Sequence, residues 1–529
     1  MNKQWKKSKM KNLIKEKGIT LIALVVTIIV LLILAGITIG LVLGQNGIIG
    51  KAKKAIIETK ESSEKEEDNL IEMEKNINSY TYSEPWTGKI DTNWYTKEND
   101  TITEFTIITP EELAGLAQLV NSGNSFENKI IKLGKSLDLA SLEWLPIGTS
   151  ENPFKGTIDG QTYSIKNVYM SNGNNNQGLV GILSSEGKIK NIFISDGNIS
   201  GGKMVGGIVG KSYGNIENCS FKGKVSGYSA IGGISGGVSE GNVSNCINYG
   251  EIKARYQQAA GIVGKVEGSC CITKCSNFGN IYSEAGGNNF GRFSGGIIAW
   301  VYSENIDLKV EECINNGNIN GVQQVGGIIG SIGYGKVNYT GRILKCINNG
   351  NVEGNVYVGG IVGCLNSYRI EVNGCHNNQK IVEKAKYGGG IVGYSCGIVR
   401  YCSNNAPIQA VDFAGGIVGY NIGGTVEYTF NGHEVNAEMD TIGGIVGENL
   451  NSGIVRYSYN RGNIGAKEGA TVGGIVGNNN TETHVEVTKC YYLKNVAGGG
   501  INNNDVSGSA ESINEDIKSY SEFLHWIKE

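Results

Sequence analysis

The chain is poor in proline, with 5 among 529 residues, and nearly balanced in charge, with a formal net charge of −3. Scarce proline excludes a collagen-like triple helix, which also needs glycine at every third position. The low net charge and the 40% apolar content exclude a disordered chain, because such chains combine few apolar residues with a high net charge. Glycine is abundant, with 80 residues. This bias is typical of a repeated, ordered β-structure.

Residues that commonly perform catalysis or bind metal ions are scarce as well. The four histidines include His433-Glu434, which begins like the zinc-binding H-E-x-x-H helix but lacks its second histidine. Aspartate is rare between Gly197 and Asn504, and no pair of carboxylates recurs in phase with the repeats described below. We therefore expect a protein that is not an enzyme, with no catalytic residues, no metal site and no cofactor.

Positive charge is concentrated in residues 1–18, a basic leader that is followed by no further basic stripe. Nucleic acid is therefore not an expected partner. The uncharged run from Ile19 to Leu43 is long enough to cross a hydrocarbon core of about 30 Å as a helix. Because positive residues stay on the inner side, we expect a single-pass protein of the cell membrane with a cytoplasmic N-terminus. One helix is expected over 19–80, with all later residues outside the cell.

The junction Gly18-Ile19 resembles the processing site of type IV prepilins, in which a short basic leader ending in glycine precedes a hydrophobic helix. The resemblance implies that prepilin peptidase cleaves after Gly18 and methylates the new amine of Ile19. It also implies pilin or pseudopilin subunits as partners through helix 19–50. Ala23 departs from the pattern, because most major pilins carry Glu there, and this favours a minor pilin, a tip subunit or a protein retained in the membrane. An uncleaved signal anchor is the alternative.

Residues 81–170 are expected to form a cap before the repeats, and they contain four of the five prolines. Thr109-Pro110-Glu111-Glu112 predicts a helix start, with Thr as N-cap, Pro at the first helical position and Glu three residues after the cap. We expect a helix over 110–121 with one apolar face, followed by the first short strands.

A Gly-apolar-apolar-Gly unit recurs eleven times within residues 171–497, at spacings of 26 to 35 residues. The units begin at Gly178, Gly207, Gly233, Gly261, Gly296, Gly327, Gly360, Gly390, Gly416, Gly444 and Gly474. A second motif, such as Asn215-Ile216-Glu217-Asn218-Cys219, and a third short apolar strand return in the same phase. Three short strands per repeat predict one coil of a parallel β-helix, whose core forms only when coils stack. We predict an all-β parallel β-helix (β-solenoid) of about eleven coils.

These phased copies, over roughly residues 100 to 495, resemble the GLUG repeats of bacterial surface proteins. The resemblance implies a surface protein whose first open strand edge is covered by a helix. Glycine at the head of each unit indicates either a positive φ or a close approach between coils. Ile216 and Cys219 are an odd number of residues apart, so both face inward only if a bulge or bend intervenes.

Cysteine recurs at one position of the repeats, and later copies carry Thr429 and Ser458 there. The position is occupied by Cys219, Cys246, Cys275, Cys313, Cys346, Cys375 and Cys402. A site that accepts Cys, Thr or Ser favours a buried thiol stack, with disulfides or a metal site as alternatives. After a Gly and Asn linker, residues 498–529 show an amphipathic pattern from Ile513 to Ile527. It predicts a helix that closes the far end of the solenoid or docks a partner.

Together these patterns favour a pilin-like, membrane-anchored or pilus-associated surface protein. Its β-helical domain is expected to act in adhesion, with exposed Tyr and Asn side chains of the turns available for an unknown surface glycan or protein ligand. One alternative is a β-helical polysaccharide-processing enzyme, which would need a groove with converging carboxylates. Another is a purely structural envelope protein, which would have no ligand.

Overall fold

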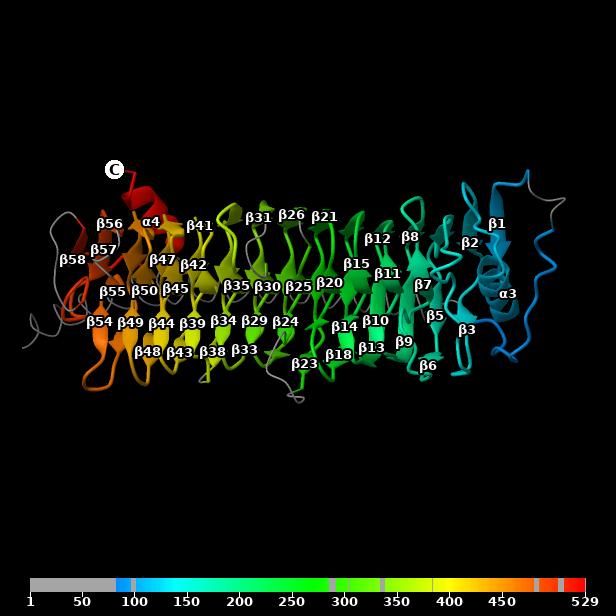
Figure 1. Ribbon diagram of the computed structural model, residues 1–529, viewed down its shortest axis with the longest axis horizontal. Helices are drawn as coiled ribbons and strands as arrows, with labels where there is room; N and C mark the ends of the chain where they lie inside the picture. The colour runs from blue at the N-terminus through cyan, green and yellow to red at the C-terminus, as the bar shows by residue number, and fades with distance from the viewer. Residues whose placement is uncertain are drawn as a thin grey trace, which may run out of the picture. The chain divides into compact units, whose positions relative to one another are not determined.

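The computed structural model describes residues 82–528 except 97–100, 285–291, 304, 334–337, 383, 480–484 and 503–508. These residues belong to one compact unit, Tyr80–Glu529, in which short strands stack coil upon coil along one axis (Figure 1). The leader, the Gly18-Ile19 junction and the helix expected over 19–80 lie outside the described residues. Within the described part of the chain, no helix is long and apolar enough to span a bilayer.

One coil illustrates how the repeat folds. It runs through β10 (Lys203–Gly206), β11 (Val209–Ser212), β12 (Asn215–Glu217) and β13 (Ser220–Gly227). Each strand pairs in parallel with its counterpart one coil away, so that four sheets run along the stack. We name them sheet D (through β10), sheet C (through β11), sheet A (through β12) and sheet B (through β13).

The number of coils is larger than expected. Sheet C has 11 strands, from β7 (Val180–Leu183) to β55 (Val476–Asn479), which matches the eleven Gly-apolar-apolar-Gly units. Sheet A has 14, because β1 (Glu104–Ile107), β2 (Ile130–Leu133) and β4 (Thr157–Asp159) join it from the cap. The solenoid therefore makes about 13 turns. The earlier coils lack the glycine unit, which is why counting that unit gave too few.

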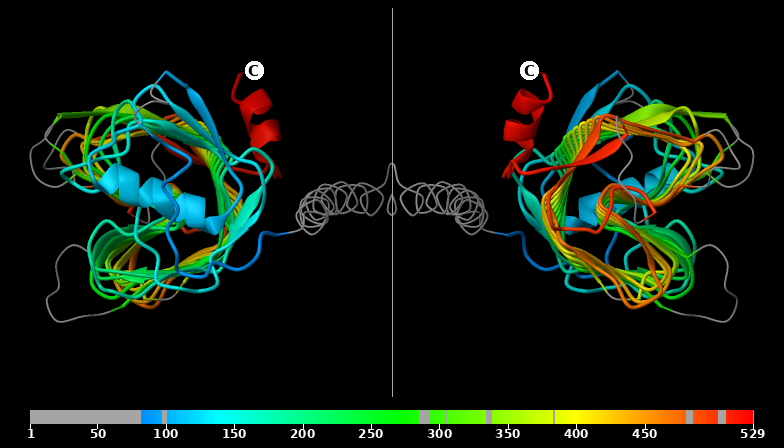
Figure 2. Two further views of the ribbon diagram at one scale, coloured as in Figure 1. Left: turned by 90° about the vertical axis from the view of Figure 1, so that its right-hand side faces the viewer. Right: turned by 90° about the vertical axis from the view of Figure 1, so that its left-hand side faces the viewer.

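Helix α3 (Pro110–Asn121) begins as the sequence predicts, with a capping box between Thr109 and Glu112. Its buried side chains, which include Leu113, Leu116 and Val120, join the core of the first coils. Seen along the stack, the helix lies across the end of the coils (Figure 2). It thereby shields apolar side chains that no preceding coil covers.

The bend between sheets A and B has a left-handed backbone. One residue per coil adopts φ between +49° and +64°, whatever its type: Asn191, Asn218, Asn245, Lys274, Glu312, Lys345, Gly374, Tyr401, Tyr428, Tyr457 and Lys489. This residue turns the chain so that Ile216 and Cys219, on either side of Asn218, both point inward. The bend that their odd spacing required is thus a single left-handed residue.

The repeat glycines lie at the corner between sheets D and C. Their conformation decides between a positive φ and a close approach as the reason for glycine. None of the eleven has a positive φ. Instead a Cβ on Gly360 would lie 2.2 Å from the carbonyl oxygen of Gly390, at the same corner of the next coil, and 2.4 Å from Cγ of Asn377 in sheet B. Close approach is therefore the reason for glycine.

Inside the coils, identical side chains form two ladders. Asn side chains donate to one another through 2.8 to 2.9 Å bonds from Asn248 to Asn460, one per coil: Asn248, Asn277, Asn315, Asn348, Asn377, Asn404, Asn431 and Asn460. The seven predicted cysteines form the second ladder and are free, buried thiols, which Thr429, Ser458 and Cys490 continue. The preferred thiol stack is confirmed, because no disulfide joins these cysteines.

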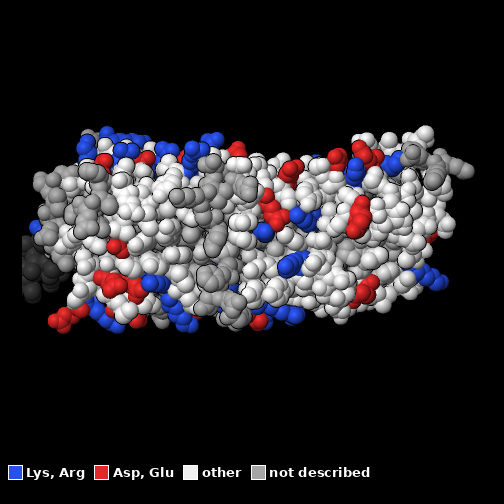
Figure 3. Space-filling model, viewed as in Figure 1, with Lys and Arg blue, Asp and Glu red and all other residues white. Residues whose placement is uncertain are grey.

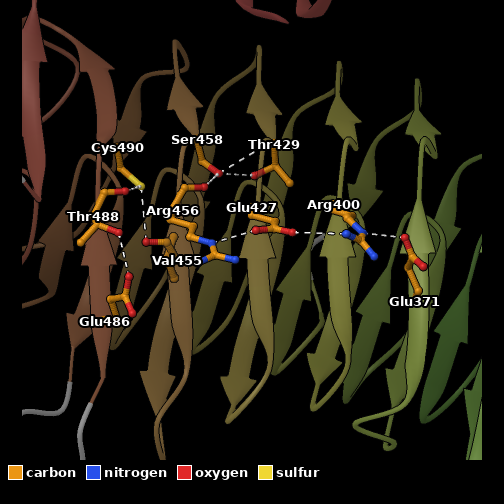
Figure 4. A network of polar contacts seen from close by, with 10 residues as sticks. All are labelled: Glu371, Arg400, Glu427, Thr429, Val455, Arg456, Ser458, Glu486, Thr488 and Cys490. Carbon is orange, nitrogen blue, oxygen red and sulfur yellow. Dashed lines mark hydrogen bonds and ion pairs between the residues drawn. The ribbon is translucent and has the colours of Figure 1, made fainter. Parts of the chain in front are cut away.

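The outer faces of the sheets also carry ladders, and on sheet A one of them consists of charged side chains. Glu427 lies between Arg400, at 3.6 Å, and Arg456, at 2.8 Å, while Arg400 also contacts Glu371 at 2.6 Å (Figure 4). Like charges in neighbouring coils would repel, so the alternation of sign keeps this register.

The C-terminal segment differs from its prediction. Ile513 belongs to a strand, β58 (Ala510–Ile513), and the helix is confined to α4 (Tyr520–Trp526). Phe523 packs on Phe430 and Tyr459, which lie on the outer side of sheet B. The helix therefore lies against the flank of the coils (Figure 2) instead of closing their end, because its apolar face packs on these aromatic rings and buries them.

Candidate binding groove

The corner that presses inward between sheets D and C pinches the cross-section, which shows two lobes with a notch between them (Figure 2). Outside the corner, side chains of the two sheets meet along this notch, which we call the groove. Tyr387 of β39 (Tyr387–Gly389) meets Tyr420 of β45 (Val418–Ile422) in an edge-to-face contact with ring centroids 5.1 Å apart. The repeat glycines thus shape the groove, although none of them contributes a side chain to it.

Two columns of outward side chains in register line the groove. On sheet C the column contains Lys211, Lys265, Trp300, Ser331, Cys364, Tyr394, Tyr420 and Glu448. On sheet D it contains Phe293, Gln324, Tyr357, Tyr387, Phe413, Thr441 and Thr471.

The first part of the groove is a hollow of about 610 Å³. Met204, Ile182 and Tyr213 give it apolar surface. Its polar lining consists of Ser150, Asn175, Asn176, Ser184, Ser185, Lys203, Lys211 and Glu240. Its volume lies in the range of small-molecule sites, although its lining is more polar than is usual for them.

Charge in the groove is concentrated next to this hollow. Glu267 accepts hydrogen bonds from Lys211 and Lys265, each at 2.8 Å. Burial disfavours the charged carboxylate of Glu267, but these bonds outweigh it and lower its pKa. Burial likewise disfavours the Lys211 ammonium, yet its bond to Glu267 raises the pKa of Lys211. Glu267 and Lys211 therefore stay ionised and neutralise one another in part.

Aromatic rings dominate the next coils. Trp300 of β25 (Ile298–Val301) stacks on Tyr302 at 4.5 Å and contacts Phe293 of β24 (Phe293–Gly295) at 5.1 Å. The Lys265 ammonium lies 5.0 Å from the Trp300 ring, a cation–π contact.

A second aromatic group fills three successive coils. On sheet D, Tyr357, Tyr387 and Phe413 follow one another with ring centroids 5.0 Å apart. On sheet C, Tyr394 and Tyr420 face them, and Tyr357 contacts Tyr394 at 5.0 Å. All five rings are half-buried, so their edges remain at the surface. Burial raises the pKa of Tyr357 to about 12, so its hydroxyl stays neutral and can donate a hydrogen bond.

Between the two aromatic groups lies a coil with small or amide side chains. Ser331 of β30 (Ile329–Ile332) is fully buried, and its Oγ has no hydrogen-bond partner. Oε1 of Gln324, in β29 (Gln324–Gly326), and Nε1 of Trp300 are also unpaired. Three unpaired polar atoms in adjacent coils are unusual, because buried polar groups nearly always have partners.

These groove residues were not predicted from the sequence, although the repeat contained the signal. Tyr394 and Tyr420 directly follow the closing glycine of their units, and Tyr357 and Tyr387 stand three residues before the first glycine. Of the residues considered for chemistry, His433 borders a separate hollow of about 330 Å³ and accepts a bond from the amide of Glu434. Among the described residues, no group of three or more His, Cys, Asp or Glu is placed to hold a metal ion.

Comparisons with known proteins agree with the repeat. The family model "The GLUG motif" matches residues 201–226, the coil from β10 to β13. Halomucin of Haloquadratum walsbyi is 30% identical over 152 residues, which cover 23% of this chain and 2% of that protein. A protein of Evansella cellulosilytica named as a Gly-rich membrane protein is 30% identical over 132 residues, or 24% of this chain and 15% of its own length. The chain thus spans a small part of both relatives.

One solved structure is also similar, a Bacteroides ovatus protein titled as an immunoglobulin A1 protease. It covers 80% of this chain and 87% of its own, with 14% identity and a TM-score of 0.25. The GLUG part of the resemblance is confirmed for the coil that the family model matches, and nothing in these comparisons shows a prepilin-like N-terminus.

Proposed function

We propose that this chain is a non-catalytic surface protein that displays a ligand-binding β-solenoid outside the cell. The observation that carries the proposal is the row of half-buried aromatic rings along the outer faces of sheets C and D, next to a hollow of about 610 Å³. Aromatic side chains supply much of the binding energy at recognition surfaces, because they bury large areas at a low entropic cost. The relatives named as halomucin and as a Gly-rich membrane protein support a location at the surface or membrane.

The residues 19–80 would anchor the solenoid, by the prepilin route if Gly18 is processed. The partners would then be prepilin peptidase, pilin or pseudopilin subunits through 19–50, and a surface glycan or protein held in the groove. The side chains that line the groove argue against a polysaccharide-processing enzyme. Glu267 is held by two lysines, and burial raises the pKa of Glu448, which lies several coils away. These two carboxylates therefore do not converge.

The anchor is tested by intact mass and N-terminal sequencing of the protein taken from its native membrane, with and without prepilin peptidase. We expect a methylated Ile19 as first residue only when the peptidase is present, and no cleavage in Gly18→Val. Ile19→Phe, which places the residue usual in prepilins, is the matched control and should be processed. An intact Met1 in every sample would refute the prepilin route and leave a signal-anchored solenoid.

Display is tested separately by treating whole cells with a protease. Fragments of the solenoid should be released from intact cells. Their absence, while lysed cells yield them, would refute an extracellular solenoid.

A further inference from the structure

The groove is not uniform along its length, and its charge ends abruptly. Lys203, Lys211, Glu240, Lys265 and Glu267 lie in or beside the first coils. From Trp300 to Tyr420 on sheet C, and from Phe293 to Thr471 on sheet D, the two columns hold no Asp, Glu, Lys or Arg. Figure 3 shows the same face: charged side chains gather along its two borders, and a largely uncharged band runs between them toward the C-terminal end. Beside the columns, the Lys386 ammonium lies 5.3 Å from the Tyr387 ring and pairs with Asp412 at 3.9 Å, so the charge that flanks the tract is neutralised in part.

Two kinds of group alternate in the uncharged tract. Aromatic rings offer apolar surface, whereas the Tyr hydroxyls and the Gln324 amide offer hydrogen bonds. Gln324 and Trp300 are half-buried, and each has an unpaired polar atom. A rotation of the Gln324 side chain would bring its Oε1 to the groove, where a donor from a ligand could satisfy it at no cost in protein bonds.

The repeat also fixes the shape of the ligand. Equivalent groups recur once per coil, about 4.8 Å apart, along the outer faces of sheets C and D. A compact molecule would touch one or two coils only. A linear polymer with a short repeat can place the same group against each of several coils.

We propose that the uncharged tract between Trp300 and Tyr420 binds a neutral, linear polysaccharide that lies along the stack. This rests on the proposed function, because it names the ligand class of the same groove. Sugar rings present apolar C–H faces and edges rich in hydroxyl groups, which is the combination that the tract offers. An acidic polysaccharide would find no cation in either column, and Lys386 beside them is already paired with Asp412. An extended polypeptide would need the regular backbone partners of an open strand edge, which the paired strands of sheets C and D do not provide.

The test uses the full-length chain in detergent micelles, labelled with a fluorophore, on an array of neutral and acidic oligosaccharides of two to eight sugars. The best neutral binder is then titrated by calorimetry. We expect retention by neutral oligomers, with affinity that rises from the disaccharide to the hexasaccharide because more coils are engaged. No retention by neutral oligomers, or retention by acidic oligomers alone, would overturn the inference.

Other coils supply variants that the fold already accepts. Tyr394→Ser and Tyr420→Ser copy Ser331, and Tyr387→Gln copies Gln324, which occupy the same positions of sheets C and D. The double variant Tyr387→Gln/Tyr420→Ser should bind the neutral hexasaccharide at least about tenfold more weakly, the loss expected when two aromatic contacts are removed.

The matched control removes stacked rings outside the groove. Tyr401 and Tyr428 stack at 5.1 Å on the bend between sheets A and B, where other coils carry Asn218 and Asn245. Tyr401→Asn/Tyr428→Asn should keep the affinity of the unaltered chain. Equal affinity in the groove variant would overturn the inference. If cells adhere to a surface through this protein while the purified chain ignores all glycans, the ligand is a protein, and the proposed function stands without the polysaccharide.

Discussion

The side-chain amide of Asn348 donates a hydrogen bond to Oδ1 of Asn377, 2.8 Å away and 29 residues further along the chain. The same amide also donates to the carbonyl of Gly350, two residues on in its own coil. Each Asn of the ladder thus closes a turn within its coil and fixes the register of the next. Because every polar atom has a partner, the ladder can lie in a dry interior without penalty.

Asn348→Leu should therefore be costly. It removes the acceptor of Asn315 and the donor of Asn377 in a fully buried ladder, and we expect a loss of about 2–4 kcal/mol in the free energy of unfolding. Urea denaturation followed by circular dichroism measures it. Asn349→Ser is the control, because Asn349 belongs to a half-exposed ladder with Asn316 and Asn378 and should change stability by less than about 1 kcal/mol. Equal effects would contradict a special role of the inner ladder.

Gly360→Ala should destabilise the coils although it adds a single methyl group. The Cβ would lie 2.2 Å from the Gly390 carbonyl oxygen, so the backbone of the neighbouring coil must move. Overpacking of this kind costs about 3 kcal/mol. Gly498→Ala, at a glycine with nothing within 4 Å of the added Cβ, is the control and should unfold at the same urea concentration as the unaltered chain. A neutral Gly360→Ala would show that the D–C corner can relax outward.

At the bend between sheets A and B, introducing a glycine should raise the stability of the fold. Lys345 has a φ of +51°, a conformation that costs a residue with a Cβ about 1 kcal/mol, whereas glycine adopts it freely. We expect Lys345→Gly to raise the unfolding free energy by up to about 1 kcal/mol. Gly374, with φ +64°, occupies the same bend in the next coil, so Gly374→Val should lower stability. Thermal and urea unfolding of the two variants should therefore shift in opposite directions.

The thiol ladder predicts both reactivity and pH dependence. Burial raises the pKa of Cys246, Cys275 and Cys313 well above the usual range, so these thiols stay protonated in the folded chain. In the unfolded chain they ionise near pH 8.5. Their contribution to stability is therefore complete below about pH 8.5 and decreases as the pH rises above it. Urea midpoints at pH 7 and pH 10 measure this loss.

The same ladder should resist a thiol reagent. We expect the native protein to react with 5,5′-dithiobis(2-nitrobenzoate) at neutral pH at most slowly, and only at Cys271, the half-buried cysteine. After denaturation without a reductant, all 12 cysteines should react. Fast reaction of several thiols in the native protein would contradict their burial, and fewer than 12 in the denatured protein would reveal disulfides.

Much of this fold could be read from the sequence, because its information is local and repeated. The spacing of the glycine units determined that the chain coils, and the capping box at Thr109 determined where helix α3 begins. The recurrence of Cys, Thr and Ser at one position determined a small buried side chain. Each of these signals depends on residues close together in the chain or on their phase in the repeat.

Other features were decided only by contacts between coils. The inward approach of the D–C corner to sheet B required glycine at Gly360 and its equivalents, and it pinched the outline into a groove. Tyr387 and Tyr420 are neighbours because two sheets meet there. Phe523 packs on Phe430 although more than three repeats of the chain separate the two residues. The sequence of one repeat cannot encode such pairs by itself, because the distance between two side chains on different sheets depends on how the whole coil bends.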